Sequence, residues 1–186
     1  MIELRVPVPG LMSEDFIDLK TFIRDVPDFP KPGIVFKDIT PLLSSPLAFA
    51  QVVERFSSHF AGAGITKVVA MESRGFIFGA PIALGLGVGF VPIRKPGKLP
   101  WTRRRHEYTL EYGTDALEIH DDAVTDGDRV LIVDDVLATG GTAAAAVALV
   151  EILGARVTGI AMLMELRFLD GRSKLGDADV FSLIEY

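Results

Sequence analysis

Four short apolar runs constrain the fold of this chain more than any other feature of its sequence. They are KVVAM (67–71), VGFVPI (88–93), RVLIVD (129–134) and RVTGIAML (156–163). Each has the length of a strand, and none alternates with polar residues, which is typical of strands buried on both faces. Segments with a helical pattern separate most of them, which predicts βαβ units. The expected fold class is therefore α/β, with a twisted, mainly parallel sheet flanked by helices.

Local patterns predict three further elements. A helix is expected after Ser13, which can cap it, with a rough apolar stripe at Phe16, Leu19, Ile23 and Val26. Pro46 is placed to begin a second helix. Apolar residues alternate along HEYTLEYGTDALEIH (106–120), which predicts a flexible antiparallel flap.

Length and composition indicate one globular domain. The chain has 186 residues, of which we expect 1–12 to be a tail and 13–186 a single domain. The net charge of −6 argues against nucleic acid as a partner. Zero cysteines exclude disulfides and thiolate metal sites and fit a reducing compartment, and MIELRVPVPG lacks the pattern of a secretory signal.

One uncharged segment, 75–93, is long enough to cross a bilayer. Its glycines and prolines divide it into a helix, a turn and a strand, so we interpret it as protein core rather than as a membrane span. No membrane partner is expected.

The stretch RVLIVDDVLATGGT (129–142) carries the strongest functional signal. Asp134 and Asp135 should emerge at the carboxyl end of a buried strand, followed by a turn at 138–142 and a helix from Ala143 to Leu153. Glycines at 140 and 141 can take positive φ and let a ligand approach the backbone. The pattern favours an anion site beside a hydroxyl-binding pair, and plain strand–turn–helix packing is the alternative.

Two nucleotide-binding motifs fit the sequence poorly. An acidic pair after a strand also occurs in ATPases, but the chain contains no G-x-x-x-x-G-K-[ST]. GLGVGF (85–90) lacks the third glycine of the dinucleotide fingerprint and precedes a strand.

VLIVDDVLATGGT resembles the phosphoribosyl-pyrophosphate (PRPP) signature of the type I phosphoribosyltransferases. PDFPKPGIVFKDITPLL, ESRGFIFGAPIA, IRKPGKLP and YTLEYG resemble, in the same order, segments of the adenine phosphoribosyltransferases within that family. The resemblance runs from about Asp28 to the C-terminus. It implies the type I phosphoribosyltransferase fold, with an N-terminal hood (about 13–45) and a lid (about 95–112).

The resemblance also implies a role for each matching position. The 5′-phosphate would bind to the anion loop, which consists of Ala138, Thr139, Gly140, Gly141 and Thr142. Asp134 and Asp135 would accept hydrogen bonds from the ribose hydroxyls. Pyrophosphate would bind to Glu72, Ser73, Arg74, Arg94, Lys95 and Lys98. Adenine would bind to Val35, Phe36 and Lys37, with Phe36 stacked on the purine. Glu111, at the end of the lid, would be the catalytic residue that handles the proton of the base. Arg103–Arg105 match no motif, and we interpret them as solvated lid charge.

The implied reaction joins adenine to PRPP and gives AMP and pyrophosphate, as in purine salvage. Mg²⁺ would be bound mainly through PRPP and pyrophosphate oxygens, with no metal site formed by the protein alone. A cytoplasmic homodimer is expected. Two alternatives remain open: a phosphoribosyltransferase for xanthine, hypoxanthine or guanine, and a PRPP-sensing regulator without catalysis.

Overall fold

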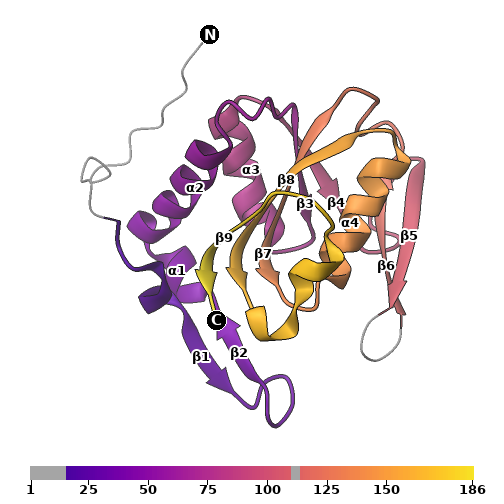
Figure 1. Cartoon of the computed structure of the whole chain (residues 1–186). Helices are drawn as coiled ribbons and strands as arrows, with labels where there is room; N and C mark the ends of the chain where they lie inside the picture. The colour runs from indigo at the N-terminus through magenta and orange to yellow at the C-terminus, as the bar shows by residue number, and fades with distance from the viewer. Residues whose placement is uncertain (1–15, 110–113) are drawn as a thin grey trace.

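The computed structural model describes residues 16–109 and 114–186, and its centre is a five-stranded parallel sheet (Figure 1). The strand order is β4-β3-β7-β8-β9, and each neighbouring pair is parallel. The strands are β3 (Lys67–Met71), β4 (Gly89–Ile93), β7 (Arg129–Leu137), β8 (Arg156–Glu165) and β9 (Val180–Glu185). The four predicted strands and their parallel arrangement are confirmed.

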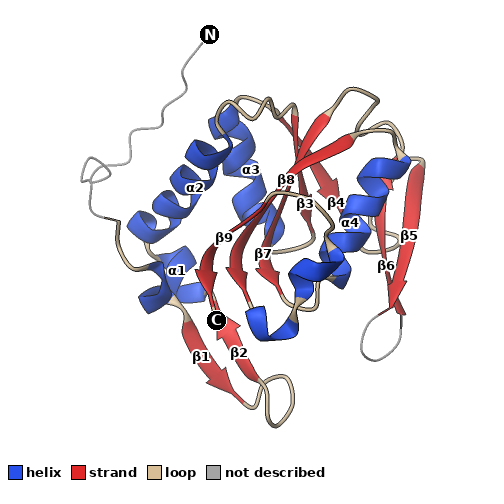
Figure 2. Cartoon of the chain, in the orientation of Figure 1, coloured by secondary structure: helices blue, strands red, loops and turns tan. Residues whose placement is uncertain are grey.

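Helices cover both faces of this sheet (Figure 2). One face packs against α1 (Thr40–Ser44), α2 (Pro46–Phe60) and α3 (Gly75–Leu86), and the other packs against α4 (Gly141–Ile152) and the β5–β6 hairpin. Strand side chains alternate between the two cores, so Val68 and Ala70 face α2 and α3 whereas Val69 and Met71 face the α4 side. This burial on both faces explains why the strands are continuously apolar.

The uncharged segment 75–93 forms helix α3, a turn at Gly87 with φ of 69°, and strand β4. This agrees with its interpretation as part of the core, where Phe78 and Ile82 are fully buried. Of the helices that the described residues form, none combines the length and the apolar character needed to span a bilayer.

The N-terminal region differs from the prediction. In place of a helix through Val26, the structure has a 3-10 turn at Leu19–Phe22 and strand β1 (Arg24–Pro27). β1 pairs antiparallel with β2 (Val35–Asp38), and the ladder satisfies backbone groups that a helix would otherwise pair. Ser13, the expected cap, lies outside the described residues.

Strand β7 is also longer than the sequence suggested. The prediction ended the strand at the acidic pair, but β8 continues alongside and pairs Val136 with Met164 and Leu137 with Glu165. Helix α4 begins at Gly141 rather than at Ala143, and Gly140 precedes it with φ of 78°. Asp134 and Asp135 are therefore held by a strand, which fixes their backbone more firmly than a loop would.

The predicted antiparallel pairing of the segment 106–120 is confirmed by the hairpin of β5 (Arg103–Thr109) and β6 (Thr114–His120). Its register runs from Arg103 opposite His120 to Thr109 opposite Thr114.

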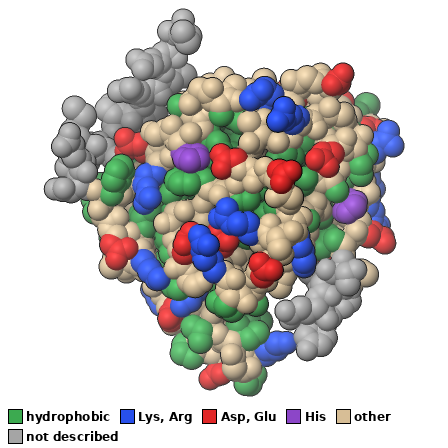
Figure 3. All heavy atoms as spheres, viewed as in Figure 1, with side chains coloured by type: hydrophobic (Ala, Val, Ile, Leu, Met, Phe, Trp, Pro, Cys, Tyr) green, Lys and Arg blue, Asp and Glu red, His purple; other side chains and the backbone are tan. Residues whose placement is uncertain are grey.

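On the face of the molecule shown in Figure 3, acidic and basic side chains are interspersed and form no large patch of a single charge.

Candidate active site

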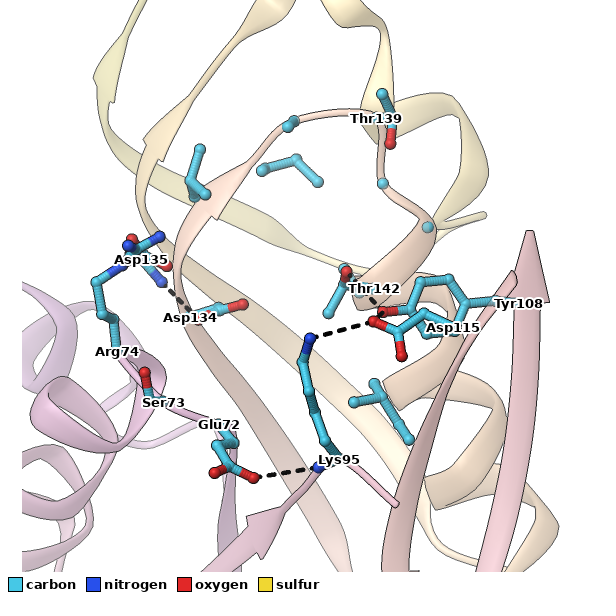
Figure 4. A pocket seen from close by; sticks show the side chains of 17 residues that line it. Glu72, Ser73, Arg74, Lys95, Tyr108, Asp115, Asp134, Asp135, Thr139 and Thr142 are labelled. Atoms are coloured by element: carbon cyan, nitrogen blue, oxygen red, sulfur yellow. Dashed lines mark hydrogen bonds and ion pairs between the residues drawn. The ribbon is translucent and has the colours of Figure 1, made fainter. Parts of the chain in front are cut away.

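A cleft of about 360 Å³ lies at the carboxyl edge of the central sheet. This is where parallel α/β sheets commonly bind ligands, because the loops after neighbouring strands meet there. The loops after β3, β4 and β7 form its walls together with the β5–β6 hairpin (Figure 4). The lining comprises Glu72, Ser73, Arg74, Lys95, Tyr108, Asp115, Leu117 and residues 134–143.

The anion loop lies between the end of β7 and the start of α4. Gly140 takes φ of 78°, a conformation that favours glycine and turns the chain into the helix. The first N–H groups of α4 have no acceptor within the helix, because the ladder starts with the bond from Ala144 N–H to Gly140 O at 2.9 Å. These N–H groups and the positive end of the helix dipole make the loop suitable for an anion.

The two acids have different surroundings. Asp135 is 5% exposed and accepts a hydrogen bond of 2.5 Å from Nε of Arg74. Asp134 accepts the backbone N–H of Asp135 at 2.9 Å. Burial and the neighbouring charge of Asp135 raise the pKa of Asp134 well above its ordinary value. A cation placed beside the pair would be attracted to the charge of Asp135 and would favour the ionised form of Asp134.

The loops after β3 and β4 are tied together by Glu72. Its carboxylate accepts hydrogen bonds from Arg94 at 3.1 and 3.0 Å and from the Lys95 N–H at 3.2 Å. The Arg94 hydrogen bond lowers the pKa of Glu72 despite partial burial. Arg94 also donates to the Lys98 carbonyl at 3.1 Å. Arg94 and Lys98 do not line the cleft, whereas Lys95 does.

The β5–β6 hairpin reaches the anion loop through two residues that the sequence did not single out as site residues. Tyr108 places its hydroxyl 3.3 Å from Thr142 Oγ1 and 3.4 Å from a carboxylate oxygen of Asp115. Asp115 also pairs with Lys95 Nζ at 3.3 Å. Burial raises the pKa of Asp115, but the Ala116 N–H and the Lys95 ammonium outweigh it and the net pKa is lowered. The position of Tyr108 at the start of the YTLEYG motif was the available signal.

The base-binding candidates lie on β2, outside the wall of the cleft. The Phe36 ring lies 5.6 Å from the guanidinium carbon of Arg74 and packs edge-on against Phe29 at 5.3 Å. Lys37 pairs with Asp25 at 2.6 Å and lies 4.1 Å from the centre of the Tyr186 ring. Arg74 thus contacts both Phe36 on β2 and Asp135 of the acidic pair. Glu111 lies outside the described residues.

The phosphoribosyl transferase domain family matches residues 40–184 of this chain. Together with a parallel sheet that carries an anion loop, an acidic pair and basic side chains at one edge, this match defines a phosphoribosyltransferase.

Individual relatives indicate which group of phosphoribosyltransferases this chain belongs to. The adenine phosphoribosyltransferase of Myxococcus xanthus is 54% identical over 97% of this chain and 98% of its own length. The crystal structure of the enzyme of that name from Thermoanaerobacter pseudethanolicus is 56% identical and superposes with a TM-score of 0.88, covering 90% of this chain and 98% of that one. The Saccharomyces cerevisiae enzyme, solved with adenine and an imino-altritol bisphosphate, is 47% identical with a TM-score of 0.85 over 89% of this chain and 96% of that one. The chain belongs to the adenine phosphoribosyltransferases.

Proposed function

We propose that this protein transfers the phosphoribosyl group of PRPP to adenine, forming AMP and releasing pyrophosphate, as an enzyme of purine salvage. The observation that carries the proposal is the acidic pair held between the anion loop and Arg74 in one cleft. That order of groups matches a ligand with a phosphate at one end, hydroxyls in the middle and a pyrophosphate at the other. The Saccharomyces cerevisiae relative, solved with adenine and a sugar bisphosphate analogue, supports the same ligand class.

The 5′-phosphate is assigned to the anion loop. Its N–H groups, the hydroxyls of Thr139 and Thr142 and the α4 dipole would together stabilise the negative charge of the phosphate. The Tyr108 hydroxyl, 3.3 Å from Thr142, would lie at the rim of this site.

The ribose is assigned to Asp134 and Asp135, whose oxygens accept hydrogen bonds from the 2′- and 3′-hydroxyls. As the bond from C1′ to the pyrophosphate oxygen breaks, positive charge develops on the sugar. The negative charge of Asp135, and of Asp134 once it is ionised, would stabilise the charge on the sugar, and the burial of Asp135 would strengthen that effect.

The leaving pyrophosphate is assigned to the loops after β3 and β4. Arg74 and Lys95 line the cleft and supply positive charge, and Ser73 supplies a hydroxyl. Glu72 binds Arg94 and the Lys95 backbone, so Glu72 and Arg94 would shape this loop while Lys98 lies behind it. Because Arg74 pairs with Asp135, the pyrophosphate would compete with that carboxylate for the guanidinium.

The adenine is assigned to the hood. Phe36 would stack on the purine, and the backbone groups of Val35 and Lys37 would read its polar edge. N9 of adenine bonds to C1′ as the pyrophosphate departs, and the base must lose one proton. Glu111 is proposed to accept that proton, and closure of the lid would keep water away from the sugar.

Mg²⁺ is proposed to bind mainly through oxygens of PRPP and pyrophosphate. Among residues 16–109 and 114–186 no cluster of three metal-binding side chains occurs, and the acidic pair is the donor set nearest to the proposed sugar site. One or two carboxylates completed by substrate phosphates suit this ion, which would neutralise charge on the leaving group.

We further propose that the enzyme is a cytoplasmic homodimer. The absence of cysteine from the sequence fits a reducing compartment. Apolar side chains at Ile77 and Leu84 of α3 are exposed in the monomer, which suits a surface covered by a second copy.

The test is a substrate panel with the purified protein, PRPP and Mg²⁺, in which adenine, hypoxanthine, guanine and xanthine are supplied separately. Adenine should give AMP with a kcat/KM about 10⁴-fold above the 6-oxo purines, because mismatched polar groups would stay unpaired in the hood. Comparable values for hypoxanthine or guanine would refute the base assignment. No turnover with any base would favour the PRPP-sensing alternative.

A further inference from the structure

The anion loop is supported from behind by a turn that lies outside the cleft. A Cβ atom added to Gly140 would lie 2.2 Å from the carbonyl oxygen of Gly171, and one added to Gly171 would lie 2.1 Å from the carbonyl oxygen of Ala138. The two backbones therefore touch glycine to glycine, with no room for a side chain. Gly140 also has a positive φ, whereas Gly171 does not, so close approach alone requires glycine at 171.

The residue that follows this contact, Arg172, is held by Glu165. Two hydrogen bonds join them, from Nε at 3.0 Å and from Nη2 at 2.6 Å. Arg172 also donates to the Val180 carbonyl at 2.8 Å, and the Ser182 hydroxyl donates to Glu165 at 3.0 Å. The Glu165 residue is 4% exposed, and the Arg172 hydrogen bonds lower the pKa of its carboxyl group. A bidentate pair with a buried carboxylate fixes the orientation of the guanidinium, which a single hydrogen bond would not do.

Glu165 also connects to the strand that leads into the loop. It is the last residue of β8 and lies opposite Leu137, the last residue of β7. The next residue, Leu166, donates its N–H to the Leu137 carbonyl at 2.9 Å. The end of β8 thus holds both neighbours of the anion loop: its backbone pairs with the end of β7, and the Glu165 carboxylate binds Arg172 of the turn at 170–172.

We propose that Arg172 is a positioning residue for the anion loop, which through Glu165 holds Gly171 against Gly140 so that the loop N–H groups converge on the 5′-phosphate. Arg172 does not line the cleft, so it acts through Gly171 rather than on the ligand. The inference rests on the proposed function, because it assigns the phosphate end of PRPP to this loop. It specifies which ligand groups should respond: the 5′-phosphate, and not the pyrophosphate or the base.

Two variants test the two links. Gly171→Ala must displace the turn or the loop by about 1 Å, and displacements of that size can cost about 10²-fold. Arg172→Lys keeps the positive charge but loses the bidentate geometry. Arg167→Lys is the matched control, since Arg167 lies in the same turn region and pairs with Glu185 at the surface.

The measurements are the steady-state constants and calorimetric binding of ribose 5-phosphate and of pyrophosphate. We expect Gly171→Ala to raise KM for PRPP and Kd for ribose 5-phosphate about 10–10²-fold, and Arg172→Lys to raise both less. The Kd for pyrophosphate and the KM for adenine should stay within about twofold, as should every constant of the control.

Equal weakening of ribose 5-phosphate and pyrophosphate would indicate general disruption of the cleft and would overturn the proposal. Parent-like constants in Gly171→Ala would overturn it as well. Whether or not Gly171→Ala folds, an unchanged Kd for ribose 5-phosphate in Arg172→Lys refutes the positioning role. Failure of the proposed function is distinguishable, because the unmodified protein would then form no AMP.

Discussion

Replacement of Gly79 by alanine should destabilise the protein even though alanine is the better helix former. Gly79 lies inside α3, where it faces strand β3. An added Cβ would lie 2.6 Å from the Ala70 Cβ and 3.1 Å from a ring carbon of Phe90. Favourable carbon–carbon contacts need about 3.5–4.0 Å, so the helix must move outward by about 1 Å.

The magnitude follows from two opposing terms. Overpacking of a core contact costs about 1–3 kcal/mol, and this contact is at the severe end because Ala70 lies on a central strand. The higher helix propensity of alanine stabilises the folded protein by about 1 kcal/mol relative to glycine. A net loss of about 1–2 kcal/mol should lower Tm by about 2–8 °C in a chain of this size.

Gly85→Ala is the matched control in the same helix. Its added Cβ would lie 2.9 Å from the Ser57 hydroxyl oxygen, the end of a side chain that can rotate away. That hydroxyl has no hydrogen-bond partner among the described residues, so its rotation breaks no bond. Helix propensity should therefore dominate, and stability should be unchanged or raised by up to about 1 kcal/mol.

Urea denaturation and thermal unfolding of both variants measure the difference. The kcat/KM for PRPP should also fall in Gly79→Ala, because Arg74 immediately precedes α3 and would move with the helix. A Gly79→Ala protein as stable as the parent would refute the packing argument, and equal losses in both variants would refute the distinction between rigid and rotatable neighbours.

Three further predictions concern the acidic residues. The double variant Asp134→Asn, Asp135→Asn should fold, but PRPP binding should weaken by about 1.5–3 kcal/mol for each charge-assisted hydrogen bond that is lost. Calorimetry measures this affinity. If both affinity and turnover match those of the parent protein, the ribose assignment is wrong. Because the pKa of Asp134 is raised, the folded protein holds a proton that the unfolded chain has lost, so this group's contribution to stability falls as pH rises from about 4 through the folded pKa. Asp134→Asn should reduce this pH-dependent loss of stability, as measured by urea titrations without added ligand at several pH values. A pH profile of stability equal to that of the parent protein would argue against the raised pKa. Glu111→Gln should keep the PRPP affinity and lower kcat about 10²–10⁴-fold, whereas Glu107→Gln should change neither quantity much. A near-normal kcat in the Glu111 variant would reject the proton-acceptor role.

The sheet was predictable because its strands are buried on both faces. Continuous apolar runs such as 67–71 and 129–133 can satisfy their backbone only within a covered parallel sheet. The order β4-β3-β7-β8-β9 was not predictable, because periodicity within a strand does not identify its neighbours.

The N-terminal helix was a wrong prediction for a related reason. Residues 16–26 have a rough helical stripe, but pairing of β1 with β2 depends on residues about ten positions further along the chain. Tertiary pairing overrode a weak local preference. The same reason explains the extension of β7 past the acidic pair, since its partner residues lie on β8.

The position of the cleft was predictable to the extent that its residues follow strands directly. The anion loop, the acidic pair and Arg74 line one cleft because each lies near or just after the carboxyl end of a parallel strand. Tyr108 and Asp115 reach it across the β5–β6 hairpin, and Gly171 reaches the anion loop from 31 residues beyond Gly140 in the numbering. Contacts made by such distant segments leave no local pattern in a sequence.

The hairpin β1–β2 forms a sheet of its own and shares no ladder with the five central strands. Among the described residues, the strands that carry the proposed base-reading groups form a ladder with each other alone, whereas the proposed sugar groups lie on a strand of the central sheet and the proposed phosphate groups follow that strand. The two proposed binding regions therefore rest on separate hydrogen-bonded ladders. Substitutions in the hairpin can change which nucleobase is accepted without disturbing the central ladder, so a lineage can acquire a new base preference while it retains its phosphoribosyl donor.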